Sequence, residues 1–109
     1  MPTCPTAEPP PLERRARPRR PLRRECVVRK DGPHPRRWPA LAYDLSSAGI
    51  GLALALPLSV GSALVIEPWG GARPLRARVV RTAAASDAWL HGCALAEPLD
   101  DEDLRRWLG

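Results

Sequence analysis

Short apolar segments separated by turn residues make up most of this 109-residue chain. The clearest alternation lies at residues 73–82, where Leu75 and Val79 fall on one face and Arg76 and Arg78 on the other, as in a half-buried strand. Glycine and proline close most of these segments, as expected of turns. The pattern predicts six strands, over residues 26–30, 37–45, 49–56, 62–67, 73–82 and 89–97.

The last residues have helical character instead. Four acidic residues at 100–103 suit the first turn of a helix, where the helix dipole favours negative charge. Leu104, Trp107 and Leu108 then fall on one helical face. Six short strands without intervening helices favour an antiparallel barrel or sandwich. We therefore expect an all-β domain with a short C-terminal helix over residues 100–108.

Residues 1–12 have a different composition, rich in proline and without an apolar period, and we expect them to form a disordered tail. The domain itself is then expected to span residues 13–109, including a flexible Pro/Arg-rich segment at its start. Fourteen prolines exclude a helical bundle, because each removes a backbone donor and interrupts a helix.

The cysteines and apolar segments indicate the environment of the protein. Cys4, Cys26 and Cys93 show no CxxC spacing, which favours reduced thiols in the cytoplasm over a disulfide framework. Apolar segments are too short and too often interrupted to cross a bilayer, so no membrane insertion is expected.

Positive charge is concentrated near the start of the chain. The net charge is +5, but residues 14–37 alone carry eleven Lys/Arg against Glu25 and Asp31, a local +9. The remainder of the chain is therefore net negative. Such a patch attracts phosphate groups, whether of a nucleotide, a nucleic acid or an anionic membrane.

Catalytic and metal chemistry find little support in the sequence. Asp44, Ser46 and His34 have the residue types of a hydrolytic triad, but nothing places His34 beside Ser46. Cys26 and Cys93 lie within apolar strand patterns, which favours buried thiols over metal ligands. We expect no enzymatic activity, no metal and no other cofactor.

Two features are open to a functional interpretation. The first is the arginine segment, in which all seven basic residues from Arg14 to Arg24 are arginine, the side chain whose planar fork suits phosphates and guanine edges. The second is the turn Asp44-Leu45-Ser46-Ser47-Ala48-Gly49. By itself this sequence is also typical of an ordinary turn, in which Asp44 and Ser46 bond backbone groups and Gly49 takes a positive φ.

Together the two features resemble the PilZ family of cyclic di-GMP receptors. The family's RxxxR motif is matched by Arg15 to Arg19, and its [D/N]xSxxG motif by Asp44 to Gly49, in the expected order. The glycine-centred segment 90–95 is similar to the family's last strand. The resemblance extends from Glu13 to the C-terminus.

This resemblance implies a six-stranded antiparallel barrel with a C-terminal helix, and a ligand bound on the outer face. It implies that Arg15 and Arg19 contact phosphates and guanine edges, and that Arg14 adds a further phosphate contact. It also implies that Asp44, Ser46 and Gly49 hold a guanine. The N-terminal arginine segment would become ordered on binding and signal to an effector protein.

The sequence is also compatible with two other functions. A small nucleic-acid-binding barrel would use the same arginines, but aromatic residues are few and several fall on expected core positions, which leaves little stacking surface. A PilZ-like adaptor without a ligand would act through protein contacts alone, and the intact motifs count against it.

Overall fold

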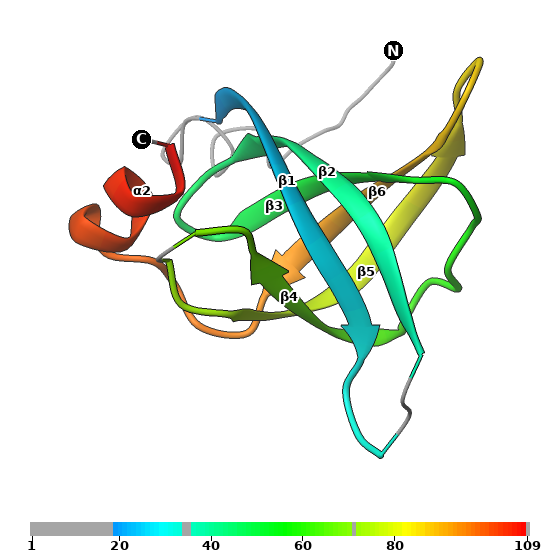
Figure 1. Ribbon diagram of the computed structural model, residues 1–109, viewed down its shortest axis with the longest axis horizontal. Helices are drawn as coiled ribbons and strands as arrows, with labels where there is room; N and C mark the ends of the chain where they lie inside the picture. The colour runs from blue at the N-terminus through cyan, green and yellow to red at the C-terminus, as the bar shows by residue number, and fades with distance from the viewer. Residues whose placement is uncertain (1–18, 34–35, 71, 109) are drawn as a thin grey trace, which may run out of the picture.

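The computed structural model describes residues 19–33, 36–70 and 72–108. Six antiparallel strands form a closed barrel in the order β1-β2-β3-β6-β5-β4, and one helix follows (Figure 1). The expected barrel with a C-terminal helix is therefore confirmed, and the alternative of a sandwich is wrong. The elements are β1 (Arg20–Lys30), β2 (Arg37–Leu45), β3 (Gly49–Leu54), β4 (Ala63–Pro68), β5 (Leu75–Ala84), β6 (Trp89–Leu95) and α2 (Asp101–Leu108).

The largest difference from the sequence prediction lies in β1, which begins at Arg20 rather than at residue 26. Arg20 pairs with Leu45 and Pro21 with Asp44, so the end of the arginine segment is part of the sheet. The register shifts between Pro21 and Arg24, an irregularity that accommodates a proline near the end of a strand. The predicted tail, residues 1–12, lies outside the described residues.

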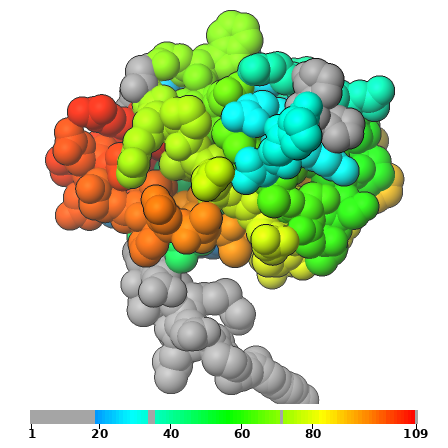
Figure 2. Space-filling view, turned by 90° about the horizontal axis from the view of Figure 1, so that it is seen from below, coloured from blue at the N-terminus to red at the C-terminus, as the bar shows by residue number. Residues whose placement is uncertain are grey.

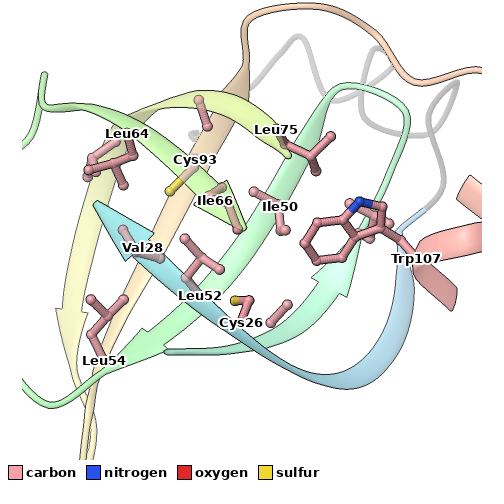
Figure 3. Packing of buried hydrophobic residues seen from close by; sticks show 14 of the residues in the cluster. Cys26, Val28, Ile50, Leu52, Leu54, Leu64, Ile66, Leu75, Cys93 and Trp107 are labelled. Atoms are coloured by element: carbon pink, nitrogen blue, oxygen red, sulfur yellow. The ribbon is translucent and has the colours of Figure 1, made fainter. Parts of the chain in front are cut away.

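The barrel interior is filled by aliphatic side chains from all six strands, with Trp107 of α2 covering one end (Figure 3). Leu52, Leu64 and Ile66 are fully buried. Cys26 and Cys93 lie in the same core, and burial raises the pKa of the first to about 11 and of the second to about 12. Both thiols therefore remain protonated at neutral pH, in agreement with the expectation of buried thiols.

One polar side chain is fully buried in this core. Nε2 of His91 accepts a hydrogen bond from the backbone N–H of Leu58 at 2.9 Å. Nδ1 itself has no partner. Leu58 belongs to the segment between β3 and β4, so the bond fixes this segment to β6.

Helix α2 is attached to the barrel through Arg24. Its Nη1 donates to the carbonyl oxygens of Arg106 (2.8 Å) and Trp107 (3.0 Å), and its Nη2 donates to the carbonyl of Trp69 (2.9 Å). The guanidinium also lies 5.5 Å from the centroid of the Trp107 ring. Carbonyls in the last turn of a helix lack intrahelical partners, and a cation there also complements the helix dipole. Arg24 therefore links β1, the segment after β4 and the end of α2.

Within the described ranges, no helix has the length and apolar character required to cross a membrane.

We predict that Arg24→Ala destabilises the protein by about 2 kcal/mol, because three carbonyls lose a charged donor and Trp107 loses its cover. For a domain of this size, Tm should fall by about 10 °C, measured by thermal denaturation. The matched control is Arg23→Ala, which removes the same charge from an exposed neighbour. Equal Tm values for the two variants would contradict the role assigned to Arg24.

Candidate functional site

Arg19, the last residue of the first motif, meets the second motif where the start of β1 lies beside the end of β2. Arg19 immediately precedes β1, and its guanidinium makes a two-point contact with the carboxylate of Asp44. Nε donates to Oδ2 at 3.0 Å and Nη2 donates to Oδ1 at 2.6 Å. The pairing of Pro21 with Asp44 across β1 and β2 produces this approach. Two residues 25 positions apart in the sequence are thus joined in a fork-to-fork geometry.

The pair is accessible to solvent. The side chain of Arg19 is 40% exposed and that of Asp44 is 26% exposed. The hydrogen bond to Asp44 raises the pKa of Arg19, so the guanidinium is charged at any physiological pH. The site consequently contains a cation whose planar fork is occupied by a carboxylate.

The turn after β2 is held by Ser46, which is 3% exposed. Its Oγ accepts hydrogen bonds from the backbone N–H groups of Gly49 (3.1 Å) and Ala48 (3.3 Å). The backbone N–H of Ser46 donates to the carbonyl of Gly49 at 2.9 Å. Ser46 therefore fixes the turn conformation, and only its hydroxyl hydrogen is left to donate to another group.

A glycine is required at position 49 because neighbouring atoms approach its Cα closely, and not because its backbone has a positive φ. The expected positive φ is wrong, because the described glycines with positive φ are Gly32, Gly61 and Gly70. A Cβ at Gly49 would lie 3.1 Å from the carbonyl oxygen of Cys93 and 3.2 Å from Nη1 of Arg19. The absent side chain therefore allows Arg19 to lie directly over the turn.

Tyr43 extends the site along the outer face. A register shift between Ala42 and Asp44 places the adjacent side chains of Tyr43 and Asp44 on the same side of β2. Both lie against Gly51 of β3, where a Cβ would come within 2.6 Å of Tyr43 and 2.5 Å of Asp44. Burial, followed by the charge of Asp44, raises the pKa of Tyr43, so its phenol is neutral.

Arg81 borders the same surface from β5. A second register shift, between Val79 and Arg81, turns its side chain across Gly92 of β6, where a Cβ would lie 3.1 Å from Cγ and Nε of Arg81. Gly92 is paired with Gly51 in the adjoining strand. The two glycines thus allow Tyr43, Asp44 and Arg81 to lie directly over the backbone of β3 and β6.

Sequence analysis did not assign Tyr43 or Arg81 to the site. Strict alternation from Val79 places Arg81 inside the barrel, and only the register shift moves it outside. The sequence does contain an indication of this register shift, because an arginine stands at a position that the alternating pattern of β5 places inside the barrel. Several aromatic residues were expected in the core, but Trp107 alone of the described aromatics is fully buried, and Trp69 is 64% exposed.

The structure brings together Arg19, Asp44, Ser46 and Gly49 among the predicted ligand-binding residues. Arg14 and Arg15 lie outside the described residues, as does His34 of the rejected triad. Of the described residues, no group of three or more His, Cys, Asp or Glu is placed to hold a metal ion.

Several arginines of the basic segment, residues 14–37, contact other parts of the domain. Arg24 binds α2, as described above. Arg29 and Arg37 both contact Glu67, at 3.5 and 2.5 Å. Asp31, in the β1–β2 connection, lies 3.5 Å from Arg76 of β5. Figure 2 shows the cyan β1–β2 connection and the yellow β5 on the same face of the molecule. Among the described residues of the patch, Arg24, Arg29 and Arg37 are therefore engaged in contacts within the domain.

A family model described as PilZ domain matches residues 13–109. The chain belongs to the PilZ domain family. The resemblance drawn from the two motifs is thereby confirmed, and the match covers the whole chain after the first twelve residues.

The fold of this chain is similar to that of a solved structure of the Bacillus subtilis inhibitor of motility, MotI/DgrA. That structure matches 87% of this chain with a TM-score of 0.61 and 20% sequence identity. The chain spans about half of that protein, since the match covers 48% of its length. At this identity the likeness shows a shared fold. No curated protein matches the chain.

We predict that Ser46→Ala lowers the free energy of unfolding by about 1–3 kcal/mol, because the buried N–H of Gly49 loses its acceptor. Urea denaturation measures the change. Ser47→Ala is the control, since no hydrogen bond is made by the half-buried side chain of this neighbouring serine in the described structure. Unchanged stability of Ser46→Ala would show that the hydroxyl does not fix the turn.

Proposed function

We propose that this PilZ domain protein is a receptor for cyclic di-GMP, which it binds on the outer face of the barrel around Arg19 and the Asp44–Gly49 turn. Family membership supports the ligand class. The observation that carries the proposal is the two-point contact between Arg19 and Asp44 beside Gly49, which unites the two motifs on one surface.

The chemistry of the surface fits the ligand. Cyclic di-GMP has two phosphodiester anions and two guanines. The fork of Arg19 matches phosphate oxygens or the O6/N7 edge of guanine, and its plane can stack on a base. The carboxylate of Asp44 accepts hydrogen bonds only, so it suits the N–H groups on the opposite edge of guanine. Ser46 contributes by holding the turn and by its remaining donor, and Gly49 leaves room for the base.

Binding requires the Arg19–Asp44 contact to open or to be shared. Because both side chains are partly exposed, water screens their attraction, and such pairs are worth about 0–1 kcal/mol. Opening the Arg19–Asp44 pair so that each side chain contacts the ligand therefore costs little free energy. The ligand offers each side chain a new partner, an anion for Arg19 and N–H donors for Asp44.

Arg14 and Arg15 supply further phosphate and guanine contacts in this proposal. The arginine segment becomes ordered when the ligand binds, and the altered surface signals to an effector protein in the cytoplasm. The role needs no chemical step and no cofactor besides the ligand itself.

Arg19→Ala should weaken cyclic di-GMP binding about ten- to a hundredfold, since each charge-assisted hydrogen bond contributes about 1.5–3 kcal/mol. The same loss is expected for Arg15→Ala. Isothermal titration calorimetry measures the affinity, and Arg20→Ala, an exposed arginine one position along, is the matched control. If Arg19→Ala retains the affinity of the control, the proposed site is wrong.

Salt dependence separates this proposal from the nucleic-acid alternative. A protein that grips a single-stranded polyanion releases condensed counterions, with a log–log slope of about −0.7 per phosphate contacted. A compact dinucleotide has two phosphates, so its affinity should fall only gently with salt. We expect tight cyclic di-GMP binding, poor competition by GMP and weak, salt-sensitive binding of random RNA. Tight RNA binding together with absent cyclic di-GMP binding at low salt would favour the alternative.

A further inference from the structure

Strand β5 has an open edge at one end of the barrel. It pairs with β4 only over Leu75–Arg78 but continues to Ala84, and there it pairs only with β6. Residues 80–84 are all exposed. The resulting β5–β6 hairpin projects from the barrel at the upper right of Figure 1, beyond the segment that joins β3 to β4.

The backbone of this edge has hydrogen-bonding groups directed away from the barrel. Ala85 donates to Ala88 at 2.8 Å, closing the hairpin. Because bonded and non-bonded pairs alternate along an antiparallel ladder, Ala83 bonds to Leu90, while Thr82 and Ala84 direct their N–H and C=O groups outward. Among the described residues, no backbone group is bonded to these outward positions.

The last three residues of this edge carry no charge or proline that would prevent strand addition, although a register shift lies at its base. Thr82, Ala83 and Ala84 are uncharged, and no proline interrupts them. The side chain of Val80, at the base of the edge, is 51% exposed, and that of Val60 in the adjoining segment is 61% exposed. A strand added here would satisfy four backbone groups and cover apolar surface.

We propose that this edge binds the same edge of a second copy of the chain, forming a two-fold symmetric dimer through antiparallel pairing of residues 82–84. With Ala83 opposite Ala83, Thr82 of each copy lies opposite Ala84 of the other. Four N–H···O=C bonds then form between the copies. The small alanine side chains at the centre allow the close spacing of a non-hydrogen-bonded pair.

Charge complementarity favours a second copy as the occupant. Antiparallel pairing brings the tip of each hairpin beside the base of the other. The tip carries the exposed Asp87, for which the described residues provide no salt bridge, and the base carries Arg78 and Arg81. Arg81 lies opposite Ala85 in this register, so like charges do not face each other. The segment is thus complementary to itself.

The dimer is weak because the shared edge is short. It buries less than the area of about 1,000 Å² that a stable interface requires, so a dissociation constant of about 0.1–1 mM is expected. Sedimentation velocity of the full chain over a range of protein concentrations should show a monomer that converts reversibly to a dimer. No ligand is needed, so this test is independent of the proposed cyclic di-GMP binding.

Thr82→Pro is the diagnostic variant. It removes an outward N–H from each copy without removing a bond to β6, and thereby eliminates two of the four bonds between copies. The dissociation constant should rise about ten- to a hundredfold. Thr82→Val keeps the N–H and the β-branched shape, so it should dimerise like the parent chain. Far-UV circular dichroism establishes that both variants retain the barrel.

Two further measurements identify the surface. Asp87→Arg should weaken the dimer at low salt, and combining it with Arg78→Asp should restore it. Amide exchange of Thr82 and Ala84 should slow as protein concentration rises, whereas Ala83, already bonded to β6, should change little. A monomer at all concentrations, or a dimer that Thr82→Pro leaves intact, would overturn the proposal. A strand from another protein would then be the remaining occupant of the edge.

Discussion

Closure of the barrel by β1 is the constraint on which the rest of the structure depends. β1 pairs with β2 between Arg20 and Arg29, apart from the register shift, and with β4 through its second half, so the first strand joins the sheet at both sides. The same strand positions Arg19 over the β2–β3 turn and Arg24 against the end of α2. The Arg19–Asp44 contact and the attachment of the helix are therefore separated by only a few residues of one strand.

Two register shifts place polar side chains on the outer face of the barrel, because each shift turns a side chain outward. One shift turns Asp44 and Tyr43 outward together, and the other turns Arg81 outward, each across a glycine of the neighbouring strand. Asp44 occupies the guanidinium fork of Arg19 with both carboxylate oxygens, the two-point geometry that a guanidinium also forms with phosphate.

The sequence allowed six strands and the final helix to be predicted because Gly and Pro end most segments and inward positions recur at every second residue. The start of β1 was missed because its arginines and prolines have low strand propensity, and only the distant partner strand β2 orders them. The approach of Arg19 to Asp44 was expected only from the family resemblance. Nothing local in the sequence distinguishes Arg24, which binds a helix, from Arg19, which binds a carboxylate.

The position of Trp107 has a spectroscopic consequence. Its indole is 2% exposed beneath Arg24, whereas Trp69 is 64% exposed and Trp38 and Trp89 are half-buried. Acrylamide therefore quenches the emission of Trp69 readily and reaches that of Trp107 only when α2 leaves the barrel. The protected fraction of intrinsic fluorescence is a label-free optical signal of helix attachment, already present in the natural chain.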